Sequence, residues 1–155
     1  MEDIVILYLD IDGTLIMTTE RHHQNGSYEI GHGCLEFLMY ATQNYDCRWL
    51  SFHARLGFIN NVSRVFREAL GVNELRSDWK DVINLIQPAL WRRHKVEAIN
   101  LCEDFLWIDD DVSIVCQDVL AANNMTDRWV KAHLNHFPAD LYRLREILEL
   151  SLIHI

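Results

Sequence analysis

The chain has few of the residues that break or cross-link a fold. Only two of its 155 residues are proline and six are glycine, whereas 50% are hydrophobic. A chain of this length and composition can bury a sizeable core, so we expect a folded protein and no disordered chain. The four cysteines contain no Cys-x-x-Cys pair, and we expect buried free thiols in a reducing compartment.

Positive charge is also in short supply. The sequence has 14 Lys and Arg against 23 Asp and Glu, which gives a net charge of −9. This balance opposes loose contact with nucleic acid or with an anionic membrane, although a local basic patch remains compatible with it. No apolar run approaches the length of a membrane span, and the acidic start at Glu2 and Asp3 lacks the basic region of a signal peptide. We therefore expect a cytoplasmic protein with no membrane partner.

The strongest positive signal is an apolar run at residues 4–9 that leads directly into an acidic turn. Such a run is typical of a strand buried on both faces, as in the centre of a parallel sheet. The turn contains Asp10 and Asp12, followed by Gly13 and Thr14. Two carboxylates at the end of a buried strand need compensation of their charge, and a hard divalent cation provides it.

Hydrophobic periodicity along the rest of the chain alternates between strand and helix. Strands are expected at 4–9, 47–50, 72–76, 105–108 and 128–132, and helices at 35–43, 58–70, 78–87, 92–102, 112–120 and 139–150. The polar stretch 18–33 is expected to form a loop or a short hairpin. The alternation predicts an α/β fold: a three-layer, Rossmann-like sandwich around a mostly parallel sheet of about five strands. We expect residues 1–155 to form a single domain.

A second acidic pair follows the apolar strand at 105–108. Because the carboxyl ends of parallel strands lie at the same edge of a sheet, Asp10 and Asp12 should converge with Asp109 and Asp110 if their two strands are neighbours. Such a cluster needs a cation to stay ionised. Mg²⁺ fits, since it accepts a few carboxylates and keeps water molecules that a phosphate can replace.

Taken in order, these residues resemble the haloacid dehalogenase-like phosphatases. Residues 10–14 match the first motif of that family, D-x-D-G-T. Ser51 matches the hydroxyl residue that ends the next core strand, and Lys95 matches the lysine that precedes the fourth core strand. Asp109 and Asp110 match the late acidic pair. The resemblance extends over nearly the whole chain.

The resemblance implies a role for each motif. Asp10 would be the nucleophile that forms an aspartyl-phosphate, and Asp12 would be the general acid and then the general base. Ser51 would donate a hydrogen bond to the phosphoryl group, and Lys95 would neutralise charge on its oxygens. Mg²⁺ would be held by the Asp10 carboxylate, the Asp12 carbonyl and the late acidic pair, with either of its two members as the direct ligand.

Four further residues are candidates for binding the substrate. Gly13 allows the sharp turn, and the backbone N–H groups at Gly13 and Thr14 can point at a phosphate. His53 and Arg55 follow Ser51 closely enough to contact the substrate. The segments between the motifs are too short for a full cap domain. A capless site would be open to a small phosphorylated molecule and favours a bulky one, such as a nucleic-acid end or a phosphoprotein; alternatively, another subunit could lend a cap, so the oligomeric state stays open.

Three alternatives remain beside a phosphatase for small molecules. The first is a polynucleotide-end phosphatase linked to nucleic-acid repair. The second is a catalytically degenerate domain of the same fold that binds Mg²⁺ or a partner. The third is a phospho-acceptor of the receiver type, which is disfavoured because receivers carry their adjacent acidic pair after the first strand, whereas here the pair comes late.

Overall fold

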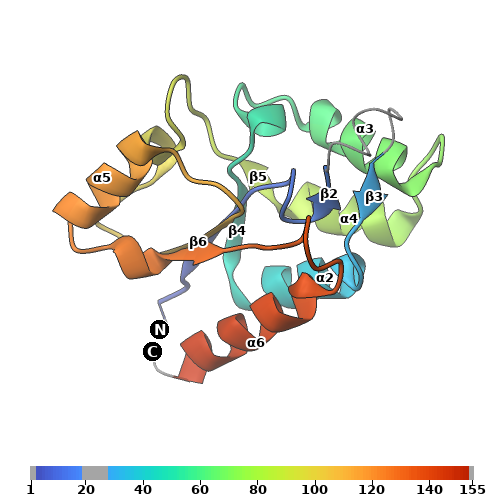
Figure 1. Ribbon diagram of the computed structural model, residues 1–155. Helices are drawn as coiled ribbons and strands as arrows, with labels where there is room; N and C mark the ends of the chain where they lie inside the picture. Colours follow the sequence, from blue (N-terminus) through green and yellow to red (C-terminus); the bar gives the residue numbers. More distant parts are fainter. Residues whose placement is uncertain (1–2, 19–27, 154–155) are drawn as a thin grey trace.

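The computed structural model describes residues 3–18 and 28–153 and shows an α/β fold (Figure 1). A five-stranded sheet has the order β5-β4-β1-β6-β7, and each neighbouring pair of strands is parallel. Its strands are β1 (Ile6–Leu9), β4 (Asp46–Trp49), β5 (Gln87–Pro88), β6 (Phe105–Asp109) and β7 (Trp129–Lys131). The predicted mostly parallel, Rossmann-like sheet is confirmed.

Helices cover both faces of this sheet and complete the three-layer sandwich. They are α2 (Cys34–Asn44), α3 (Ile59–Leu70), α4 (Ser77–Leu85), α5 (Ile114–Ala122) and α6 (Asp140–Ile153). The core on one face contains side chains from α2, α3, α4 and α6, and the core on the other contains side chains from α5. The helices α2 and α6 lie side by side beneath the sheet in the view of Figure 1.

The central strand β1 explains why both layers form. Successive side chains of a strand point to opposite faces, so Leu7 and Leu9 enter one core while Ile6 and Tyr8 enter the other. All four are buried, as expected from the apolar run. Burial on both faces fixes the register of β1 between β4 and β6, and this register determines where the residues that follow the strands lie.

Two predicted elements are wrong. Residues 72–76 do not form a strand; the edge of the sheet is instead β5, where Arg48 of β4 pairs with Gln87. Proline at an edge strand costs little because the missing N–H faces away from the ladder. The helix expected at 92–102 is reduced to one 3₁₀ helix, η2 (Lys95–Ala98). The carboxylate of Glu97 accepts hydrogen bonds from the backbone of Arg92 and His94 ahead of η2, which holds that segment as a loop.

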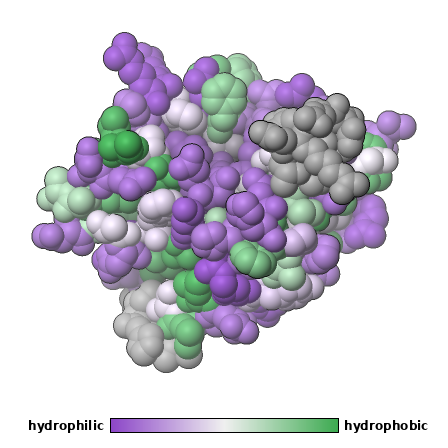
Figure 2. Space-filling model, viewed as in Figure 1, coloured by the Kyte–Doolittle hydropathy of each residue, from purple (hydrophilic) through white to green (hydrophobic). Residues whose placement is uncertain are grey.

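The two ends of the segment that follows β1 pair with each other as short antiparallel strands. Strand β2 (Ile16–Met17) pairs antiparallel with β3 (Glu29–Ile30), which agrees with the hairpin alternative, while residues 19–27 lie outside the described part of the chain. No helix within the described ranges is long and apolar enough to cross a membrane. Figure 2 shows mostly hydrophilic side chains over the middle of the face seen in Figure 1, with separate hydrophobic patches toward the edges.

Candidate active site

The carboxyl ends of β1 and β6 meet in the middle of the sheet. The two strands are hydrogen-bonded neighbours, with Leu9 opposite Ile108, and the N–H of Asp10 extends the pairing by donating to the Ile108 carbonyl over 3.0 Å. From β1 the chain builds the sheet outward to β4 and β5 on one side, and from β6 to β7 on the other. This reversal of strand order creates the crevice in which open α/β sheets bind ligands.

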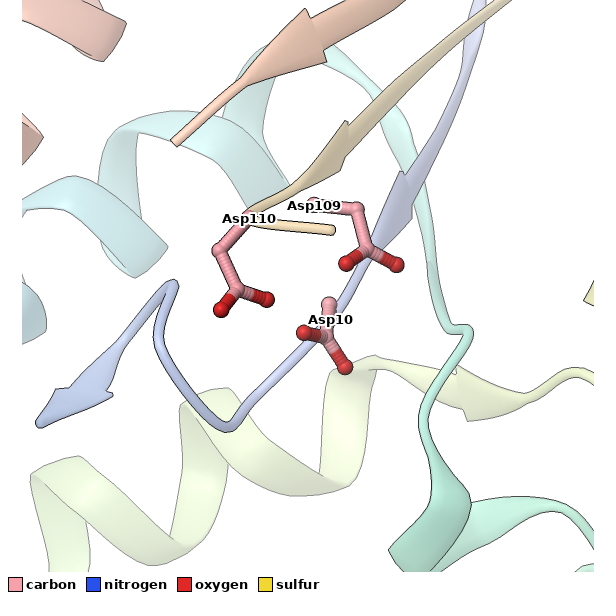
Figure 3. A group of neighbouring side chains, drawn as sticks. All are labelled: Asp10, Asp109 and Asp110. Atoms are coloured by element: carbon pink, nitrogen blue, oxygen red, sulfur yellow. The ribbon is translucent and has the colours of Figure 1, made fainter. Parts of the chain in front are cut away.

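Three aspartates gather at this point. Asp10 follows β1, Asp109 ends β6 and Asp110 comes next, and each offers one carboxylate oxygen such that all three oxygens lie within 4.8 Å of one another. Figure 3 shows the carboxyl groups turned toward one another. Asp10 and Asp109 are buried, so these charges have little solvent to screen them. The convergence expected from the two strand ends is present for these three residues.

Lys95 contributes a cation to the cluster. Its Nζ lies 3.0 Å from Oδ1 of Asp10 and 2.6 Å from Oδ2 of Asp109. Burial alone would lower the pKa of Lys95, but the two carboxylates raise it above its ordinary value, which keeps the amine charged. The start of η2 therefore delivers the lysine to the carboxyl ends of β1 and β6, although the helix predicted around it is absent.

One ammonium does not neutralise three carboxylates. Burial, and then the charge of Asp10, raise the pKa values of Asp109 and Asp110 above the ordinary range of a carboxyl group. The two acids thus tend to retain protons unless a cation replaces them. Three converging carboxylate oxygens are hard ligands, which suit Mg²⁺ and leave several of its coordination positions for water or phosphate. The donor set fits the metal that the resemblance implies.

The turn after β1 approaches the cluster closely. Gly13 has φ +76°, which favours glycine, and a Cβ at this position would collide with the carboxylate of Asp110. The backbone N–H groups of this turn already have partners: Gly13 donates to the Ile16 carbonyl and Thr14 donates to the Ile11 carbonyl. The hydroxyl of Thr14 points toward Asp10, with its Oγ1 3.5 Å from Oδ2.

Ser51 lies where β4 ends, as the motif order predicts. It is buried, and its Oγ accepts a hydrogen bond from the N–H of His53 at 3.2 Å, which caps the 3₁₀ helix η1 (Phe52–Ala54). The Ser51 carbonyl accepts from the indole N–H of Trp91, also at 3.2 Å. Since β4 is the neighbour of β1, this serine ends at the same edge of the sheet as Asp10.

Asp12 and His53 form a separate pair beside the cluster. Nε2 of His53 lies 2.9 Å from Oδ2 of Asp12. The other oxygen of Asp12, Oδ1, is shielded from solvent and has no hydrogen-bond partner within the described residues. The side chain of Asp12 is not part of the three-carboxylate group, so the convergence expected of four acids is found for only three of them.

Arg55 does not reach the acidic cluster through any observed contact. Its guanidinium stacks on Phe52, 4.5 Å from the ring centroid, and lies 5.9 Å from the ring centroid of Trp91. A hollow of about 440 Å³ opens at this place. Its lining is Arg55, Leu56, Leu90, Trp91, Arg92 and Glu97. The structure thus associates Arg55 with a surface next to Ser51.

Sequence reasoning missed one contact at the site. The indole N–H of Trp107 donates to Oδ2 of Asp109 at 3.2 Å. The two residues are two positions apart on β6 and so share a face, which is the pattern that could have revealed the contact.

Comparison of the chain with protein-family models, with curated proteins and with solved structures gives no match. The geometry of the side chains and the motif order together define an α/β fold with a buried acidic cluster, of a composition suited to a cation, at the switch point of its sheet.

Proposed function

We propose that this protein is a Mg²⁺-dependent phosphohydrolase of the haloacid dehalogenase-like type, which cleaves a phosphate monoester through an aspartyl-phosphate. The observation that carries the proposal is the convergence of Asp10, Asp109 and Asp110 with the ammonium of Lys95 at the ends of two adjacent central strands. Phosphoryl transfer depends mainly on positioning and on neutralising charge, and this group of residues is suited to both tasks.

The metal would be held by the carboxylates of Asp10 and of Asp109 or Asp110, together with the Asp12 carbonyl. When bound, Mg²⁺ would draw negative charge from the phosphoryl oxygens. Lys95 touches both Asp10 and Asp109, so it lies where a phosphoryl group attached to Asp10 would need a second cation. Ser51 supplies a hydroxyl from the neighbouring strand end.

In the first step, a carboxylate oxygen of Asp10 bonds to phosphorus while the bond from phosphorus to the ester oxygen breaks. Asp12, in its protonated form, gives its proton to the departing oxygen. In the second step, water attacks the phosphorus, Asp12 takes the proton of that water, and Asp10 is released with inorganic phosphate. The nucleophile and the acid thus return to their starting states.

The decisive experiment follows release of p-nitrophenol from p-nitrophenyl phosphate in the presence of Mg²⁺. The wild-type protein should turn over, and Asp10→Asn and Asp110→Asn should lose activity while their circular dichroism spectra are unchanged. Asp81→Asn is the matched control, since Asp81 is an exposed aspartate of α4 outside the site. Mg²⁺ binding without hydrolysis of any phosphate ester would instead favour the catalytically degenerate alternative.

A surface next to Ser51 favours a second candidate, a polynucleotide-end phosphatase. Phe52 is 63% exposed and packs edge-on against Trp91, with Arg55 over its ring. Arg92 and Arg93 are exposed, and their guanidinium groups form no ion pair within the described residues. Aromatic rings beside free arginines suit a single-stranded nucleic acid, whose bases stack and whose phosphates attract cations. This local positive charge contrasts with the net charge of −9.

If this candidate is correct, hydrolysis of an oligonucleotide should depend on the aromatic and arginine residues of this surface, and hydrolysis of a small phosphate ester should not. Phe52→Ala and Arg92→Gln should raise the KM for a single-stranded oligonucleotide with a terminal phosphate and leave hydrolysis of p-nitrophenyl phosphate unchanged. Leu85→Ala serves as the control, because Leu85 is similarly exposed (65%) but belongs to α4. A phosphopeptide hydrolysed more efficiently than every oligonucleotide would count against the nucleic-acid candidate and for a protein substrate.

A further inference from the structure

His53 connects two residues of the proposed machinery. Its backbone N–H donates to Ser51 Oγ at 3.2 Å, and its ring Nε2 lies 2.9 Å from Oδ2 of Asp12. The sequence suggested that His53 contacts the substrate, but its ring faces the proposed general acid. We infer that His53 is a positioning residue: its ring holds Oδ2 of Asp12 and thereby fixes the direction of the carboxyl group that exchanges the proton. This inference rests on the proposed function.

The chemistry of the pair determines the direction of the hydrogen bond. A carboxylate can only accept hydrogen bonds, so Nε2 of His53 carries the hydrogen and donates to Oδ2 of ionised Asp12. This bond fixes the orientation of the Asp12 carboxyl group.

The other oxygen of Asp12, Oδ1, is shielded from solvent and has no hydrogen-bond partner within the described residues. The contact with His53 is therefore the one hydrogen bond that holds this carboxyl group within the described part of the chain.

Asp12 needs such support because its own surroundings restrain it little. Its side chain is 41% exposed, whereas the side chain of His53 is 17% exposed. His53 belongs to η1, directly after Ser51, and the N–H of Leu50 donates to the carbonyl of Leu9 at 2.8 Å at the end of β4. His53 is thus anchored to the strand that lies beside β1, and a carboxyl group held by it keeps a constant direction relative to Asp10.

Substrates with different leaving groups can distinguish the positioning of Asp12 from substrate binding or a structural role. An ester oxygen that is a poor leaving group needs a proton as its bond to phosphorus breaks, whereas a nitrophenolate departs without one. A loss of proton transfer therefore slows an alkyl phosphate more than p-nitrophenyl phosphate. General acid–base catalysis contributes on the order of 10²-fold or more to such a step.

The experiment measures kcat and KM of the full chain with Mg²⁺ for both substrates. His53→Ala should lower kcat for the alkyl phosphate by on the order of 10²-fold and change p-nitrophenyl phosphate hydrolysis only a few-fold, with KM unchanged for both. The double variant with Asp12→Asn should be no slower on the alkyl phosphate than Asp12→Asn alone, because both remove one step. His53→Gln retains an N–H donor and should recover part of the loss. The control is His32→Ala, an exposed histidine outside the site.

Other results would overturn the inference. A rise in KM with kcat unchanged would assign His53 to substrate binding. An equal loss of kcat on both substrates, together with a lower melting temperature, would make it structural, and His53→Gln behaving like His53→Ala would exclude the hydrogen bond. If the wild-type protein hydrolyses neither substrate, the proposed function and this inference both fail; if only the His53 pattern is absent, Asp10→Asn still decides the proposed function.

Discussion

The ammonium of Lys95 lies 3.0 Å from Oδ1 of Asp10, which comes 85 positions earlier in the chain. In the absence of metal, this contact and the one to Asp109 provide the cationic partner of the buried carboxylates. Replacing one partner of a buried ion pair leaves the other charge uncompensated, which costs about 3–5 kcal/mol. The stability of the metal-free site therefore depends on Lys95.

We expect Lys95→Met to lower the free energy of unfolding by about this amount in metal-free buffer, and Mg²⁺ to restore part of the loss. Urea denaturation with and without Mg²⁺ measures both effects. Lys80→Met, at an exposed position of α4, is the control. Equal stability of Lys95→Met and the wild-type protein without metal would show that the acids are neutral and need no cation.

The effect of Mg²⁺ on stability should grow with pH. The pKa values of Asp109 and Asp110 are raised in the folded state. At every pH between the ordinary carboxyl pKa and these raised values, the metal-free folded state therefore binds more protons than the unfolded state. Metal-free stability should thus fall as pH rises through this window. Mg²⁺ replaces the protons, so its stabilisation should be small in acid and largest above the window.

Thermal unfolding with and without Mg²⁺ across this pH range is the measurement. Asp110→Asn removes one of the titrating ligands, so its metal-free melting temperature should depend less on pH and respond less to Mg²⁺. A Mg²⁺-induced rise that is the same at every pH would mean that the metal binds elsewhere.

Substitution of Gly13 should disturb the acidic cluster in addition to straining the backbone. Gly13→Ala places a Cβ against the carboxylate of Asp110, so this carboxylate must move. Gly71 offers a matched control: it has a similar φ of +67° at the end of α3, but nothing lies within 4 Å of a Cβ added there. Both substitutions carry the cost of positive φ, roughly 1–2 kcal/mol.

Only Gly13→Ala should weaken Mg²⁺ binding and abolish phosphatase activity. Isothermal titration with Mg²⁺ and the p-nitrophenyl phosphate assay separate the two variants. Normal Mg²⁺ affinity in folded Gly13→Ala would show that Asp110 is not held against this turn.

Asp140 should stabilise the fold away from the site. It accepts from the N–H of His133 at 2.6 Å and from Nε of Arg143 at 2.6 Å. Burial alone would raise the pKa of Asp140, but the Arg143 guanidinium and the His133 N–H hold it below its ordinary value. Such a group stabilises the folded state above the unfolded pKa, and this contribution is lost as pH falls through the folded pKa.

Asp140→Asn should therefore cost about 1–3 kcal/mol near neutral pH and progressively less in acid. Chemical denaturation at several pH values tests this, with the exposed Asp118→Asn of α5 for comparison. A cost that does not change with pH would mean that packing, and not the charge, makes Asp140 important.

The long apolar patterns predicted the main strands and helices correctly, whereas predictions for the short polar segments were wrong. The run at 4–9 and the stripe of α3 each bury a continuous set of side chains, so pattern and structure agree. Residues 72–76 resemble a strand by composition, yet Leu75 is the only one of them that is buried. The actual edge strand is two residues long and includes Pro88, for which no periodicity can exist. Hydrogen bonds from loops, such as those to Glu97, also leave no periodic signal.

Some residues of the candidate site could be predicted from the sequence and others could not. Residues placed by strands could be foreseen, because the carboxyl ends of β1 and β6 bring Asp10 and Asp109 together once the strands are neighbours. The pairing of His53 with Asp12 could not, because it depends on how η1 turns after Ser51. Arg55 follows the same turn, but its guanidinium stacks on Phe52. This position depends on three-dimensional packing and could not be predicted from the sequence.

The pairing of β1 with β6 has a consequence for synthesis on the ribosome. A nascent chain that has released η2 but not yet β6 contains Asp10 and Lys95 and still lacks Asp109 and Asp110. Such a fragment has no complete binding site for a cation or a phosphate ester. Under the proposed function, Mg²⁺ binding should therefore appear only after β6 pairs with β1, at a late stage of folding.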